Sequence, residues 1–95
     1  MNLYLLTQDE FAGYDTFDSM IVAANNTQEA KHLHPLEKTT CYKEPKMTDE
    51  AYRSYLWIGM YGYWASSPEN VKVDKIGITN KYPKAKVILA SYNAS

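Results

Sequence analysis

The sequence has little of what defines several common protein classes. Its only cysteine is Cys41, so no disulfide can form within the chain, which fits a reducing compartment such as the cytoplasm. Four glycines and four prolines in 95 residues are too few for a fibrous or low-complexity chain. No apolar run approaches the roughly 18 residues of a membrane span, and the N-terminal segment lacks the basic residues of a signal peptide. We therefore expect a soluble, cytoplasmic protein that does not contact a membrane.

Basic residues are absent from the first third of the chain. Residues 1–30 contain five carboxylates and no Lys or Arg, whereas residues 31–95 contain all ten basic residues and six acidic ones. This division could produce one negative and one positive face, or two ordinary solvated surfaces. The net charge of −1 provides no general attraction to a polyanion, so we do not expect direct binding to nucleic acid.

The apolar residues, 45% of the chain, indicate one compact domain spanning residues 1–95. Apolar runs and alternation predict strands, the third with a bulge near Lys75, at residues 3–8, 13–24, 71–79 and 86–94. The second and fourth strands are apolar on successive residues. We therefore expect both to be covered on their two faces, as central strands of a sheet are.

Two segments carry the signals of short helices. In residues 25–35, Asn26 or Thr27 can cap the start and Pro35 marks the end; in residues 49–57, Thr48 is the cap. We expect the intervening residues to be mostly loop. The predicted fold class is α+β: an antiparallel four- to five-stranded sheet with one or two short helices packed on one face, forming a two-layer sandwich.

No combination of residues indicates catalysis or metal binding. His32 and His34 are two residues apart, so on a helix their imidazoles point in different directions, and neither Cys41 nor another residue completes a site. The acidic residues between positions 9 and 18 do not have the spacing of a calcium-binding loop. There is also no glycine-rich phosphate loop and no serine nucleophile motif. We expect a protein that is not an enzyme and has no cofactor.

The aromatic segment "YRSYLWIGMYGYW", residues 52–64, contains six of the thirteen aromatic residues. It can be a core element, a platform for single-stranded nucleic acid, or a protein-binding face. The platform needs interleaved basic residues, and Arg53 is the only one. Tyr, Trp, Met and Arg are the residues enriched at interface centres. The candidate partner-binding residues are Tyr52, Arg53, Tyr55, Trp57, Tyr61 and Tyr63, with Asp9, Glu10 and Asp15 of the acidic loop as a second group.

The segments "YLLTQD", "GYDTFDSMIVAANN", "EAKHLHP", "SSPENVKVDKIG" and "VILASYNA" occur in an order that resembles a small family of uncharacterised proteins. That family is associated with phages, prophages and mobile regions of bacterial genomes. The resemblance covers residues 3–35 and 64–94 and carries over no functional residues. Its repeated features can serve the scaffold or a site, and they are Tyr14, Asp15, Asp18, Pro35, Trp64, Ser67 and Pro68.

The resemblance implies a context, since small motif-poor phage proteins often act by binding, including by blocking bacterial defence complexes such as CRISPR effectors. The expected function is therefore a non-enzymatic accessory protein that binds a host or defence-system protein in the bacterial cytoplasm, in the manner of an anti-CRISPR inhibitor. A homodimer is equally compatible with an exposed aromatic face in residues 52–64. The alternative is a small-ligand or nucleotide-binding module with a pocket lined by Tyr and Trp between the sheet and residues 48–63.

Overall fold

Four antiparallel strands form one sheet in the order β3-β1-β2-β4. The computed structural model describes residues 1–13, 15–39 and 42–93, so Tyr14 and Cys41 lie outside the described residues. The strands are β1 (Asn2–Thr7), β2 (Thr16–Ala24), β3 (Lys72–Ile78) and β4 (Lys86–Asn93). The helical segments are α1 (Thr27–His32), η1 (Pro35–Lys38), α2 (Asp49–Gly59) and η2 (Pro68–Asn70), with η denoting a 3-10 helix.

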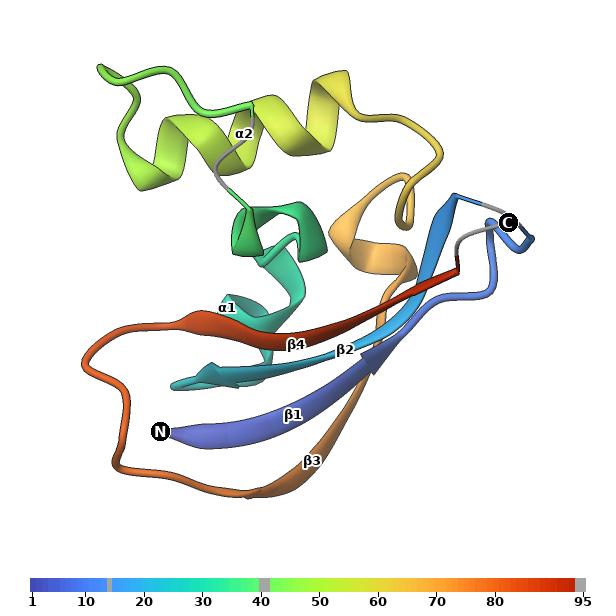
Figure 1. Ribbon diagram of the computed structural model, residues 1–95. Coiled ribbons are helices and arrows are strands. Elements are labelled where there is room, and N and C mark those ends of the chain that lie inside the picture. Colours follow the sequence, from blue (N-terminus) through green and yellow to red (C-terminus); the bar gives the residue numbers. More distant parts are fainter. Residues whose placement is uncertain (14, 40–41, 94–95) are drawn as a thin grey trace.

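All four helical segments lie on one side of the sheet (Figure 1). The α+β prediction of a two-layer arrangement with helices on one face is therefore confirmed, and the sheet has four strands. The opposite side of the sheet carries no second layer among the described residues. We call these two sides the helix face and the open face.

The register of the strands decides which side chains reach the core. Directly paired residues of antiparallel strands lie on the same face. Leu6 pairs with Met20, and both are buried on the helix face. Their neighbours Leu5 and Ile21 also pair, and both point to the open face, where they are half-buried.

The core fills the space between the helix face and the helical segments. Its largest buried side chains include Trp64, Leu6, Met20, Leu33 and Leu56. They come from β1, β2, the end of α1, α2 and the segment after α2. Because these elements share one cluster of buried residues, α2 is held to the sheet by packing.

The first predicted helix is shorter than expected. Glu29 donates its backbone N–H to the Asn26 side chain at 2.8 Å, and the Glu29 carboxylate accepts from the Asn25 N–H at 2.8 Å. The helix ends at His32 because the residue before a proline disfavours helical backbone, and His34 is extended. Pro35 then opens η1 instead of ending α1, which corrects the expected loop after residue 35.

The second predicted helix is confirmed, and it runs two residues further than residue 57, to Gly59. The Thr48 hydroxyl accepts the Ala51 N–H at 3.1 Å and caps the start of α2. The helix ends at Gly59, as its glycine predicts. Tyr52 and Leu56 are one turn apart, and both are buried.

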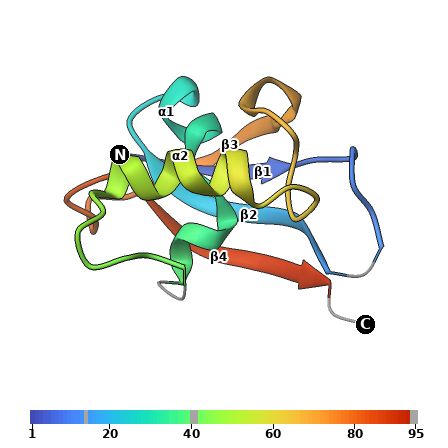
Figure 2. The same cartoon turned by 90° about the horizontal axis from the view of Figure 1, so that it is seen from above.

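The predictions for the last two strands had different outcomes. The bulge predicted near Lys75 is confirmed, because Leu3 pairs with Gly77 and Tyr4 with Lys75, which leaves Ile76 as the extra residue. The prediction that the last strand is central was wrong, since β4 is an edge strand (Figure 2). It is apolar on both sides because Val87 faces the core and Leu89 lies on the open face, paired with Ile21.

Candidate protein-binding surface

The two sides of α2 have opposite environments. Tyr52 is 3% exposed in the core, whereas Ile58 is 83% exposed and Tyr61, just after the helix, is 75% exposed. Tyr55 also lies on the exposed side. Its ring lies against the helix at Gly59, where a Cβ atom would come within 3.3 Å of it. A surface of large apolar side chains therefore runs along the outside of α2.

The acidic loop and the aromatic segment meet at this surface. The rings of Phe11 and Tyr61 have centroids 5.1 Å apart and an interplanar angle of 79°, an edge-to-face contact. We call the surface formed by Phe11, Tyr55, Ile58 and Tyr61 the aromatic ledge. Tyr55 and Tyr61 were among the predicted partner-binding residues. Phe11 and Ile58 were not, because no sequence motif includes them.

The loop that presents Phe11 is organised by the buried side chain of Gln8. Its amide oxygen accepts the N–H groups of Glu10 and Phe11, both at 2.9 Å. Its amide nitrogen donates to the carbonyl of Phe11 at 2.6 Å and to that of Phe17 at 3.0 Å. Four hydrogen bonds from one buried side chain fix the backbone of this loop. The ledge is thus a preformed surface at this end.

The acidic candidates form contacts within the fold. The Glu10 carboxylate accepts from the N–H of Ser66 at 3.1 Å and from the Asn70 side chain at 2.9 Å. Hydrogen bonding from the Ser66 side chain, together with these two bonds, lowers the pKa of Glu10. Asp15, with a left-handed φ of 61°, accepts a hydrogen bond from the Tyr92 hydroxyl at 2.8 Å, which raises the pKa of Tyr92. The Asp9 side chain is 87% exposed and forms a long ion pair with Lys72 at 3.9 Å.

Three of the candidate residues form hydrogen bonds within the fold that hold α2, or the segment after it, in place. Arg53 donates two hydrogen bonds to Glu37, from Nε at 2.9 Å and from Nη2 at 2.8 Å, and these bonds raise the pKa of Arg53. Trp57 donates from Nε1 to the His32 carbonyl at 2.8 Å. Tyr63 is half-buried, and its carbonyl accepts the Phe17 N–H at 2.8 Å.

Tyr52 requires a correction. The expectation that it could stand on an accessible face fails, because the ring is buried and its hydroxyl donates to the Thr39 carbonyl at 2.8 Å. Its spacing from Leu56 places it on the inner side of α2. The aromatic segment is therefore divided: Tyr52 and Trp64 belong to the core, and Tyr55 and Tyr61 belong to the ledge.

The two histidines have separate local roles. His34 is 1% exposed, its Nδ1 accepts the Leu36 N–H at 3.2 Å, and its burial lowers its pKa to about 4. Its ring stands edge-on to Trp57, with centroids 5.1 Å apart. The Nδ1 of His32 lies 2.7 Å from the Gln28 carbonyl oxygen. Within residues 1–13, 15–39 and 42–93, no group of three His, Cys, Asp or Glu side chains gathers that could hold a metal ion.

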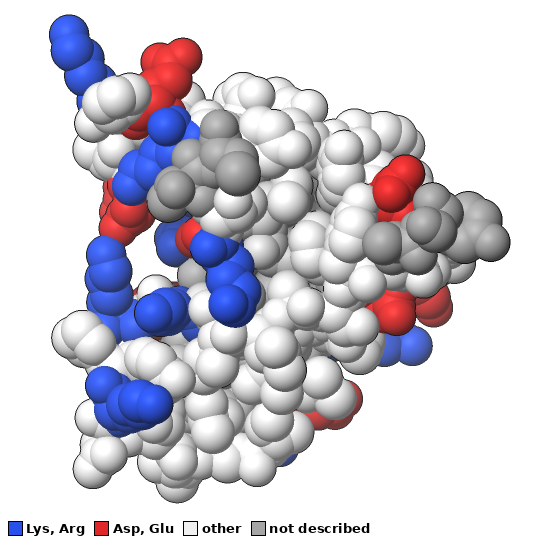
Figure 3. Space-filling model, viewed as in Figure 1, with Lys and Arg blue, Asp and Glu red and all other residues white. Residues whose placement is uncertain are grey.

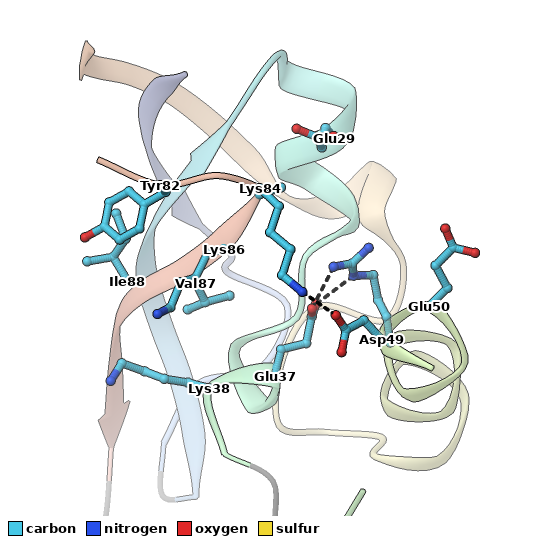
Figure 4. Close-up of a pocket in the computed structure, with 12 residues that line it drawn as sticks. Glu29, Glu37, Lys38, Asp49, Glu50, Tyr82, Lys84, Lys86, Val87 and Ile88 are labelled. Atoms are coloured by element: carbon cyan, nitrogen blue, oxygen red, sulfur yellow. Dashed lines mark hydrogen bonds and ion pairs between the residues drawn. The ribbon is translucent and has the colours of Figure 1, made fainter. Parts of the chain in front are cut away.

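A cleft of about 640 Å³ lies between the start of α2, η1 and the start of β4. Tyr82 is the aromatic residue in its lining, which is mostly charged and so differs from the expected Tyr and Trp lining. Asp49 lies 2.6 Å from Lys84 and 2.8 Å from Lys43, and hydrogen bonds from these two ammonium groups lower the pKa of Asp49 to about 2. Lys and Arg side chains gather around this hollow (Figure 3), and Lys84 points towards Asp49 within it (Figure 4).

Fold and surface together define a class: a small α+β domain that presents an exposed apolar ledge beside a charged cleft. No protein-family model, curated protein or solved structure matches the chain. The helices of the described residues are too short or too polar to cross a bilayer. The ledge and the cleft are therefore the features from which a function can be proposed.

Proposed function

We propose that this protein is a non-enzymatic accessory protein of a phage or mobile element that binds another protein through the aromatic ledge and thereby inhibits a host or antiviral-defence complex. The observation that supports binding is the exposure of Ile58 and Tyr61 at 83% and 75% on a helix whose other side is buried. Large apolar side chains gathered on one surface of a small domain are typical of interaction sites. The phage context comes from the sequence resemblance alone.

The preformed geometry of the ledge favours tight binding. The Gln8 hydrogen bonds fix the backbone of Phe11, and its ring contacts Tyr61, so less freedom of this loop is left to lose on association. Arg53 and Trp57 fix α2 against η1 and α1 by bonds to Glu37 and His32. A partner with a complementary apolar pocket would therefore meet a rigid surface.

The test is a phage-infection assay followed by direct binding. The chain is expressed in bacterial strains that each carry one defined defence system, CRISPR systems included, and phage plating is measured. The expected result is restored plating in at least one strain and binding to that purified defence complex. If no strain gains plating and no complex binds, the inhibitory function is refuted.

A matched pair of variants connects the activity to the ledge. Ile58→Ser combined with Tyr61→Ala should weaken binding by at least about tenfold, because truncating a hot-spot residue costs about 2 kcal/mol or more and tenfold corresponds to about 1.4 kcal/mol. The control is Ile78→Ser, which removes an equally exposed apolar side chain from β3, 74% exposed, and should bind like the wild type. Equal binding of all three proteins would contradict the ledge as the site.

The cleft supports a second candidate, a module for a small charged ligand or nucleotide. Its volume of about 640 Å³ is in the range of ligand pockets. Lys38 and Lys86 line it and have no ion pair among the described residues. A thermal-shift screen with nucleotides and phosphorylated metabolites tests it, since a ligand at a hundred times its Kd stabilises by about 2.7 kcal/mol. A hit lost in Lys38→Ala and Lys86→Ala would favour this candidate; no hit would exclude it.

A further inference from the structure

The sequence of β4 is that of an interior strand, yet β4 lies at the edge of the sheet. After Lys86 the strand continues as Val-Ile-Leu-Ala-Ser-Tyr-Asn, with no charge and no proline. Leu89 is 59% exposed at this edge. Among residues 1–13, 15–39 and 42–93, the only backbone hydrogen bond to β4 from outside its ladder with β2 is the one from Asp15 to Asn93. Within this described part of the chain, the outer side of β4 therefore forms no ladder with another strand.

The other edge of the same sheet is protected. In seven residues β3 carries Lys72, Asp74 and Lys75, and charged residues, lysine above all, are what natural proteins place on edge strands to prevent pairing with another chain. The protected edge and the unprotected edge flank the same central hairpin of β1 and β2. The contrast indicates that β4, and not β3, is the edge that takes up another strand.

The charges at the two ends of β4 specify what that strand can be. The strand starts with Lys86, two residues after Lys84, and Lys38 lines the same cleft. It finishes beside Asp15, whose N–H donates to the Asn93 carbonyl at 2.7 Å and whose carboxylate is bonded to Tyr92. In Figure 3, Lys and Arg side chains gather at the end where β4 begins. Each end would find its opposite charge on an antiparallel copy of the same strand.

We infer that β4 pairs antiparallel with β4 of a second copy of this chain, about a two-fold axis near Ala90, to form a continuous eight-stranded sheet. The two-fold axis places Lys86 of each copy at the Asp15 end of the other, so the charge complementarity occurs twice. On the open face, Leu5, Ile21 and Leu89 form one row across three strands, and the pairing doubles this row. The inference does not depend on the aromatic ledge.

Cysteine cross-linking in a Cys41→Ser background tests this geometry. Mixed together, Leu89→Cys and Ser91→Cys should form a disulfide-linked dimer, because the axis at Ala90 places residue 89 of one copy opposite residue 91 of the other, and opposite residues of antiparallel strands have Cα atoms about 4.5–5.5 Å apart. Each variant alone should link far less, since two copies of the same residue would stand diagonally, about 7–8 Å apart. The control Ile21→Cys should not, since three strand spacings, about 14 Å, would separate the two copies of residue 21. A second control, Asp74→Cys on β3, should also stay unlinked.

The mass of the unmodified protein should rise with concentration to that of a dimer. Sedimentation and light scattering over a range of concentrations measure this mass. Leu89→Lys should weaken this dimer by at least about tenfold, because it places an edge-protecting charge on β4. Ile76→Lys, at a β3 position 51% exposed, is the matched control and should dimerise normally. Raising the salt from 0.15 M to 1 M, where the Debye length falls from about 8 Å to about 3 Å, should weaken the dimer severalfold.

The outcomes separate the alternatives. A cross-link between residues 89 and 91 of two copies, with a dimer lost in Leu89→Lys, supports the inference, and far-UV circular dichroism confirms that this variant is folded. A cross-link at residue 21 instead would mean that two open faces stack, and one at residue 74 would mean that β3 edges pair; either overturns it. A monomer at all concentrations up to about 1 mM overturns it as well.

Discussion

The two sides of α2 show how one aromatic-rich segment is divided between stability and surface. Tyr52 on the inner side is 3% exposed and bonded to Thr39, whereas Ile58 on the outer side is 83% exposed. Because an α-helix has 3.6 residues per turn, residues of α2 that are three or four positions apart lie on the same side, so one side faces the core and the other faces solvent. Substitutions on the inner side of α2 should therefore change stability, and those on the outer side should change binding.

The largest expected effect is at Trp64, which belongs to the buried part of the segment. Trp64→Ala should lower the free energy of unfolding by about 3–5 kcal/mol, because it leaves a cavity in the core. Trp64 Nε1 is buried and has no hydrogen-bond partner among the described residues. Trp64→Phe should therefore cost much less, since it removes an N–H that is already unsatisfied. Urea unfolding measures both, and equal losses would contradict the assignment of Trp64 as a packing residue.

Acid should lower the stability of the fold through the buried side chain of His34. The folded pKa of His34 is about 4 and its ordinary value is 6.5, so between these values the unfolded chain binds more protons than the folded one. Stability should be highest above pH 6.5, fall by up to about 3 kcal/mol as the pH drops towards 4, and lose no more from this group below pH 4. Denaturant midpoints across this range measure the slope.

His34→Leu is the control for this pH dependence. It should flatten the slope between pH 6.5 and 4, although it also lowers stability at neutral pH by removing the cap of η1. An unchanged slope in His34→Leu would assign the acid sensitivity to another group.

A smaller effect is expected where α2 joins η1. Breaking the Arg53–Glu37 pair with Glu37→Gln should cost about 1–2 kcal/mol, since both side chains are largely buried and two charge-assisted bonds are weakened. A double-mutant cycle with Arg53→Met measures the coupling. The matched pair Lys84–Asp49 is exposed, so Asp49→Asn should change stability by no more than about 0.5 kcal/mol. Equal losses of stability at the two ion pairs would contradict the claim that burial makes the Arg53–Glu37 pair the stronger one.

The parts of the fold that follow from local sequence were predictable. Capping by Thr48, the end of α2 at Gly59 and the bulge opposite Leu3 all depend on neighbouring residues, and each was found where predicted. The position of β4 was not predictable from its apolar residues, because the order of strands in a sheet depends on pairing between distant segments. Pro35 was misjudged because proline both ends one helix and starts another.

The candidate site was predictable only in part. The composition of residues 52–64 indicated an interaction surface, and Tyr55 and Tyr61 lie on it. Tyr52 was assigned to the wrong side because two helical faces were possible before the core was known. Phe11 could not be found from sequence, since its place beside Tyr61 is fixed by the long-range fold and by the bonds of the buried Gln8. The carboxylates of Glu10 and Asp15 accept hydrogen bonds from Asn70 and Tyr92 within the fold.

The most direct test of the central claim is a paired measurement of stability and partner binding on Ile58→Ser/Tyr61→Ala. The free energy of unfolding should stay within about 0.5 kcal/mol per substitution of the wild-type value, because both side chains are exposed. The affinity for the inhibited complex should fall at least about tenfold. Unchanged affinity, or a loss of affinity matched by Ile78→Ser, would contradict the claim that the aromatic ledge is the binding surface.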